Sequence, residues 1–100
     1  MHLVFTSVAK RADAVKMAKT LVASALVACV SFRPIESVYS WKGEMVHARE
    51  FLLEIKTAKP VAARAWLAKH HPYRIPMIYS QKTMAVEFRY AKWVKTACKR

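Results

Sequence analysis

The segment 28–57, ACVSFRPIESVYSWKGEMVHAREFLLEIKT, places the only glycine of the chain between two long runs that are typical of β-strands. Gly43 marks the tip of a hairpin, because glycine adopts turn conformations at no steric cost. We expect a bulge or bend at Pro34, since proline has no backbone N–H for the strand ladder. The returning run alternates with a period of two. It places Phe51, Leu53 and Ile55 on one face and Leu52, Glu54 and Lys56 on the other.

The segments around this hairpin supply the remaining elements. The short apolar run HLVFTSV predicts a strand, and from Lys10 onward the apolar residues follow helical spacing. Pro60 suits the first turn of a second helix, and Pro72 ends it because the residue before proline avoids helical geometry. The expected elements are strand 2–8, helix 11–27, strand 28–41, strand 45–57, helix 59–71, strand 76–81 and helix 85–98.

This order predicts the α+β class, as a ferredoxin-like βαββαβ sandwich with an extra C-terminal helix, over a single domain of residues 1–100. Two right-handed βαβ units give a four-stranded antiparallel sheet with its helices on one face. The chain is 55% hydrophobic, so the second sheet face needs cover. We expect another subunit to provide it.

The charge of the chain is strongly basic, with 18 Lys+Arg against 6 Asp+Glu and a formal net charge of +12. Such a surface attracts phosphates and nucleic acids, although the basic residues are dispersed and a merely solvated surface is the competing interpretation. Binding to nucleic acid would then be possible but not specific. The uncharged run 20–32 is too short to span a bilayer, so no membrane partner is expected.

The two cysteines do not form the pattern of a secreted disulfide framework, which favours a reducing cytoplasm. The stretch LVAC at 26–29 matches a lipoprotein cleavage box that ends at Cys29, and the basic segment 1–33 has some features of a transit peptide. Both interpretations conflict with the strand expected at 2–8, which would belong to the mature fold.

Four short motifs occur in order along the chain. They are Ala28–Cys29–Val30, the hairpin Tyr39–Trp41–Gly43, Ile55–Lys56–Thr57, and the corner His71–Pro72–Tyr73–Pro76. In this order and spacing the sequence resembles the CutA family of divalent-cation tolerance proteins, from about residue 3 to Trp93. Each motif is weak alone, and the four in register are specific.

The resemblance implies a ferredoxin-like subunit in a tight homotrimer, with an architecture similar to that of the PII signalling proteins. It also implies clefts between neighbouring subunits, a link to copper tolerance and no established catalytic reaction. The sequence departs from the family at the corner, where Arg74 and Met77 stand in place of the usual acids, and before the last helix, which lacks the usual Gly-Asn. These departures affect any site that needs the corner carboxylates.

Candidate metal ligands are the thiol, imidazole and thioether groups that suit copper. We take Cys29, His70 and His71 as the candidate copper or divalent-metal site, with Met77, Met45 and His47 as further side chains of the right type. No CxxC or HxxxH spacing indicates a preformed site, and no cofactor is obligatory. The alternative is structural: Cys29 is a small buried strand residue, and His71 fixes the turn at the corner by hydrogen bonds.

Candidate cleft residues follow from the resemblance at Tyr39, Trp41, Lys56 and Tyr73, with Arg74 beside them. Aromatic rings and a lysine can hold a small anionic or planar ligand, and Arg74 shifts this preference toward anions. The alternative is that the aromatic residues are packing anchors of the trimer. The sequence contains no nucleophile–base pair and no glycine-rich phosphate loop, so we expect no enzyme activity.

We therefore expect a non-enzymatic cytoplasmic homotrimer that responds to divalent metal ions and binds a metal or small ligand at clefts between subunits. The alternatives are a basic trimeric module for an anionic partner, either nucleic acid or a phosphate ligand, and a purely structural trimer.

Overall fold

The computed structural model describes residues 1–99 and confirms the predicted ferredoxin-like order with an extra helix. The seven elements are β1 (His2–Val8), α1 (Arg11–Ala23), β2 (Cys29–Trp41), β3 (Glu44–Thr57), α2 (Pro60–His70), β4 (Ile78–Lys82) and α3 (Phe88–Ala97). None of the helices in this described part is both long and apolar enough to cross a membrane.

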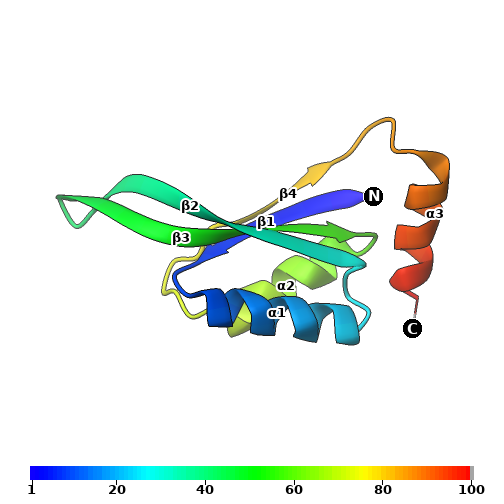
Figure 1. Cartoon of the computed structure of the whole chain (residues 1–100), viewed down its shortest axis with the longest axis horizontal. Helices are drawn as coiled ribbons and strands as arrows, with labels where there is room; N and C mark the ends of the chain where they lie inside the picture. The colour runs from blue at the N-terminus through cyan, green and yellow to red at the C-terminus, as the bar shows by residue number, and fades with distance from the viewer. Residues whose placement is uncertain (100) are drawn as a thin grey trace.

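The four strands form one antiparallel sheet in the order β2-β3-β1-β4. Helices α1 and α2 cover one face of this sheet, and α3 stands beside the end where β1 begins (Figure 1). The β2–β3 hairpin reaches well beyond both covering helices, which makes the longest extent of the molecule 46 Å against 26 and 21 Å for the other two. Because α1 and α2 lie on the same face and α3 stands at one end, the opposite face of the sheet has no helix over most of its length (Figure 1).

The core lies between the sheet and the two covering helices, as the alternation in 45–57 predicts. Leu53 and Ile55 of β3 are fully buried there beside Val4 and Val8 of β1. The helices contribute the small and medium residues Ala14, Met17, Leu21, Ala63 and Leu67. A smaller cluster under α3 joins Val94 and Cys98 to Ala28.

The hairpin tip has the geometry of a tight two-residue turn. Trp41 pairs with Glu44, and Lys42 and Gly43 between them have φ angles of 51° and 79°. Two consecutive positive φ values are the signature of a type I′ turn, whose twist matches that of the flanking strands. The glycine at the second position confirms the tip predicted from the sequence.

Of the bulge or bend expected at Pro34, the bulge is absent, so that part of the prediction is wrong. Pro34 pairs with Phe51 in a register that skips no residue from Cys29 to Trp41. The reason is that β2 is one of the two edge strands of the sheet. An edge strand tolerates a proline whose nitrogen faces away from the neighbouring strand.

Two helix ends differ from the prediction. Helix α1 ends at Ala23 instead of 27, because Ala25 turns into the left-handed region with φ 58° and the Leu26 N–H bonds back to the Leu21 carbonyl. This is a Schellman ending built without glycine, and therefore without its usual sequence signal. Helix α3 begins at Phe88 instead of 85, where the Glu87 carboxylate accepts from the Tyr90 N–H at 2.9 Å.

We predict that Leu53→Ala lowers the free energy of unfolding by about 3 kcal/mol, because it removes a fully buried side chain at the centre of the sheet and leaves a cavity. Guanidinium unfolding at fixed protein concentration measures this change. The control is Val61→Ala on α2, where the side chain is 69% exposed. The control should alter stability by less than about 0.5 kcal/mol. Equal losses in the two variants would contradict this assignment of the core.

Candidate functional site

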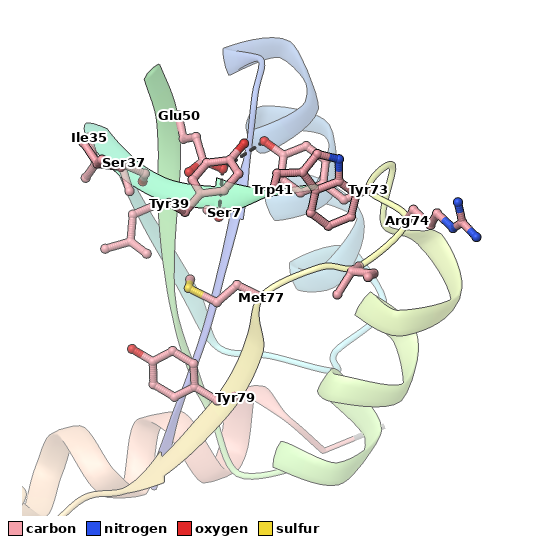
Figure 2. Close-up of a pocket in the computed structure, with 13 residues that line it drawn as sticks. Ser7, Ile35, Ser37, Tyr39, Trp41, Glu50, Tyr73, Arg74, Met77 and Tyr79 are labelled. Carbon is pink, nitrogen blue, oxygen red and sulfur yellow. Dashed lines mark hydrogen bonds between the residues drawn. The ribbon is translucent and has the colours of Figure 1, made fainter. Parts of the chain in front are cut away.

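A cleft of about 560 Å³ opens on the sheet face that α1 and α2 leave uncovered. The hairpin forms one side, and the corner between α2 and β4 forms the other (Figure 2). Ser7, Leu52 and Ile35 belong to the sheet residues that alternate away from the helix-covered core. The lining is mainly apolar and aromatic: Ser7, Ile35, Ser37, Val38, Tyr39, Trp41, Glu50, Leu52, Tyr73, Arg74, Ile75, Met77 and Tyr79.

The carboxylate of Glu50 is the only acidic group in this lining, and it is only 8% exposed. Its Oε2 accepts from the Ser7 hydroxyl at 3.1 Å and from the Tyr73 hydroxyl at 2.9 Å. Among residues 1–99 no side chain donates to Oε1, and no unpaired polar side-chain atom is sealed from solvent. Oε1 is therefore reached from the cleft.

Tyr73 connects the corner to the sheet through this carboxylate. Burial, together with the hydrogen bond to Glu50, raises the pKa of Tyr73 far above its ordinary value of 10.0. The phenol therefore stays protonated and acts as a donor throughout the physiological range. It follows that Glu50 accepts two hydroxyl hydrogens at one oxygen and presents the other oxygen to the cleft.

His71 holds the corner in place with both of its ring nitrogens. The Tyr73 N–H donates to Nδ1 at 3.0 Å, so the proton of the neutral ring is on Nε2. Nε2 lies 3.0 Å from the Ser7 carbonyl oxygen and 3.0 Å from the Thr6 hydroxyl. Because Nδ1 accepts and Nε2 donates within the chain, this neutral ring has no free lone pair for a metal.

The three predicted metal ligands lie apart. His70 is the last residue of α2, on the helix-covered side of the sheet. Its ring stacks on that of Trp66, with a centroid separation of 4.4 Å, and its Nδ1 lies 2.9 Å from the Trp66 carbonyl oxygen. His71 contacts Ser7, and Ser7 pairs with Leu52 of β3. Cys29 begins β2 and pairs with Lys56, which lies four positions along β3 from Leu52. That offset is roughly 13 Å at the rise of a β-strand.

A metal site within one chain is not supported by this arrangement. No group of three His, Cys, Asp or Glu side chains in the described residues is placed to hold an ion. Of the other sulfur and imidazole candidates, Met77 lines the cleft, Met45 is 84% exposed near the hairpin tip, and His47 contacts Glu36 at 2.9 Å. These three side chains therefore lie in different parts of the molecule and do not form a common metal site within one chain.

The predicted cleft residues come together with one exception. Tyr39, Trp41, Tyr73 and Arg74 all line the cleft, although they come from the hairpin and the corner, more than thirty positions apart in the chain. Lys56 lies outside the lining, where its ammonium donates to Ser31 at 2.6 Å and pairs with Glu54 at 3.1 Å. Within one chain this lysine lies at the base of the hairpin, where it pairs with Cys29.

Glu50 and Ser7 are the central polar residues that sequence reasoning missed. The available signal was Glu50 itself, one of the two acids inside the apolar run 45–57 of a chain with only 6 acids. Because Glu50 lies two residues from Leu52, it is on the face away from the core. An acid on that face is expected to be solvated, so nothing in the sequence singled it out. Only the packing of the corner against that face shows that Glu50 is buried.

We predict that His71 makes stability depend on pH. Burial lowers the pKa of His71 below its ordinary value of 6.5, more than the Ser7 hydrogen bond and the charges of Asp13 and Glu50 raise it. The unfolded chain therefore binds the proton more readily, so this contribution is fully present above 6.5 and is lost as the pH falls through the lowered folded pKa.

Guanidinium unfolding between about pH 5 and pH 8 measures this dependence. His71→Asn should flatten it, whereas the control His70→Asn, at an exposed position, should leave it unchanged. Parallel pH curves for the wild type and His71→Asn would contradict the role assigned to this ring.

Comparison with known proteins gives the same family over almost the whole chain. The family model described as CutA1 divalent ion tolerance protein matches residues 2–97. The divalent-cation tolerance protein CutA of Thermotoga maritima is 31% identical over 97 residues, which cover 95% of this chain and 96% of that protein. The chloroplastic CutA of Arabidopsis thaliana is 32% identical, and there the match spans 54% of the longer relative.

Solved structures agree with these sequence matches. CutA1 from Pyrococcus horikoshii superposes with a TM-score of 0.95 at 26% identity and covers 100% of both chains. CutA from Synechococcus elongatus superposes with a TM-score of 0.94 at 30% identity, covering 98% of this chain and 89% of that one. The chain therefore belongs to the CutA1 family of divalent ion tolerance proteins.

Proposed function

We propose that this protein is a non-enzymatic homotrimer that acts in divalent-cation tolerance by binding a small ligand in the Glu50 cleft. The observation that carries this proposal is the cleft itself. It combines an apolar, aromatic lining with one buried carboxylate whose second oxygen is accessible. Pockets of this kind, mainly apolar with a few placed polar groups, are typical of small-molecule sites.

The surface around the cleft supports self-association. Val38 is 65% exposed and Ile75 is 69% exposed, and both belong to the cleft lining. Strands β2 and β4 are the two edges of the sheet, and each has a free side for pairing with another chain. Association through this face would bury the apolar groups and place the cleft at the boundary between subunits. The number of three copies follows from the family resemblance.

The contacts of Ser7 and His71 support binding in preference to catalysis. The Ser7 hydroxyl donates to a carboxylate that already accepts from Tyr73. His71 contacts the backbone oxygen of Ser7 and not its hydroxyl, so within the described residues it is not placed as a base for that hydroxyl. A nucleophile needs a free base and an orienting partner, whereas in this network the Ser7 hydroxyl and both ring nitrogens of His71 are already engaged.

Copper binding is the second candidate function, and the state of Cys29 favours it. This thiol is free and half-buried on the edge strand β2, whereas Cys98 is free but only 2% exposed. One thiolate is too few ligands for copper. The proposal therefore requires that neighbouring chains supply the remaining ligands at the edge of β2. Two free thiols also fit the cytoplasmic localisation that we propose.

We predict that native mass spectrometry of the gently purified, untagged protein shows a trimer. Stoichiometric copper that is lost in Cys29→Ser and kept in the matched control Cys98→Ser would favour the copper candidate. Bound phosphate-rich mass would instead favour the anionic-partner alternative suggested by the net charge of +12. A monomer would contradict the proposed assembly.

A further inference from the structure

Within residues 1–99 of this strongly basic chain, Glu50 is a buried carboxylate without a cationic partner. It is 8% exposed, yet the ion pairs of residues 1–99 are His47–Glu36, Lys56–Glu54 and Arg89–Glu87. Its donors in the part of the chain that the structure describes are the neutral hydroxyls of Ser7 and Tyr73, both at Oε2. Buried charges in proteins are normally paired, and leaving one unpaired is costly. The missing positive charge is therefore expected from outside this chain.

The walls around the accessible oxygen suit a particular kind of cation. Tyr73 donates to Glu50, and Tyr39 lies near Tyr73 at this end of the cleft, whereas Tyr79 lies at the other end (Figure 2). Trp41 lines the same cleft nearer the hairpin tip, because it pairs with Glu44, six register positions along β3 from Glu50. Aromatic faces attract organic cations through their quadrupoles. Trp41 already shows this property, because the Lys42 ammonium lies 6.0 Å from its ring centroid.

The same surroundings disfavour a metal ion and an anion. Glu50 is the only carboxylate in the lining, which contains no histidine and no cysteine, whereas hard divalent cations need several oxygen ligands. Among residues 1–99, Arg74 is the one basic residue of the lining, and its guanidinium points away from Glu50 in Figure 2. An anion placed near Oε1 would meet a like charge without a compensating cation.

We propose that the cleft binds a small organic cation, an alkylammonium with an apolar or aromatic body, whose N–H groups donate to Glu50 Oε1. This inference rests on the ligand-binding role proposed above for the same cleft. The ammonium pairs with the carboxylate and lies against the aromatic rings. The body fills the apolar part of the 560 Å³ cleft toward Met77 and Tyr79.

The test compares two probes that share one body and differ in their head group, 2-phenylethylammonium and 2-phenylethanol. Isothermal titration calorimetry on the assembled protein at neutral pH gives the ratio of their dissociation constants. We expect the ammonium to bind the wild type at least about tenfold more tightly than the alcohol, as for hydrogen bonds to charged groups. In Glu50→Gln this preference should fall to about one.

The matched control is Glu54→Gln, which makes the same chemical change on the same strand, outside the cleft lining. It should keep the full preference for the ammonium. A preference that survives in Glu50→Gln, or that is lost equally in Glu54→Gln, would overturn the inference. If Glu50→Gln does not assemble like the wild type, the wild-type Glu50 ¹³Cδ resonance decides. That resonance should shift with the ammonium and not with the alcohol.

The probes also separate this inference from the proposed function. Equal binding of the two probes would leave a ligand-binding cleft and remove its selectivity for cations. Binding of neither probe by an intact trimer would overturn the inference as well. In that case Glu50 is already satisfied by a group from a second copy of the chain, and the mass measurement above still tests the assembly.

Discussion

The strict alternation of β3 is the constraint on which the rest of the structure depends. A strand points successive side chains to opposite faces, so the same segment must satisfy the core and the cleft. Leu53 and Ile55 are fully buried against α1 and α2, while Glu50 and Leu52 line the cleft on the other side. A register slip of one residue would place the Glu50 carboxylate in the apolar core. Fold and site are therefore specified by one register.

The corner after α2 is held against this strand by a continuous hydrogen-bond network. His71 receives the Tyr73 N–H and reaches the backbone of β1, and the Tyr73 hydroxyl then reaches Glu50 of β3. Each polar group in this chain of contacts has a partner inside the protein, except the second oxygen of Glu50, which faces the cleft. Such satisfied networks rigidify a structure. Here the network fixes the corner, which is the wall of the cleft formed by a loop. It holds Tyr73 in a defined position against the sheet.

The resemblance and the geometry bear differently on metal ions. The family is shown by sequence and structure over nearly the whole chain. The side chains that suit copper are nevertheless dispersed over the sheet, the hairpin and α2 of one chain. The cleft instead offers an aromatic lining and one carboxylate, which are the features of a site for an organic ligand. These observations place small-molecule binding ahead of direct metal chelation in our proposal.

The sequence by itself determined the order of elements, the hairpin tip at Gly43 and the buried face of β3, because all three depend on local preferences and on periodicity. It also brought Tyr39, Trp41, Tyr73 and Arg74 together, through the family resemblance. It did not reveal the glycine-free end of α1 at Ala25 or the unbroken pairing at Pro34. Those features depend on tertiary packing and on which strand forms the edge.

Only the tertiary structure decided the state of Glu50 and His71. Glu50 accepts from Ser7 and Tyr73, which lie 43 and 23 positions away, and Nε2 of His71 contacts Thr6 and Ser7, which lie 65 and 64 positions away. No local pattern encodes contacts at such separations, since burial of a polar group is set by the segments that fold over it. The sequence could therefore name the face on which Glu50 lies. The packing of the corner made that position a buried, half-satisfied carboxylate facing a cleft.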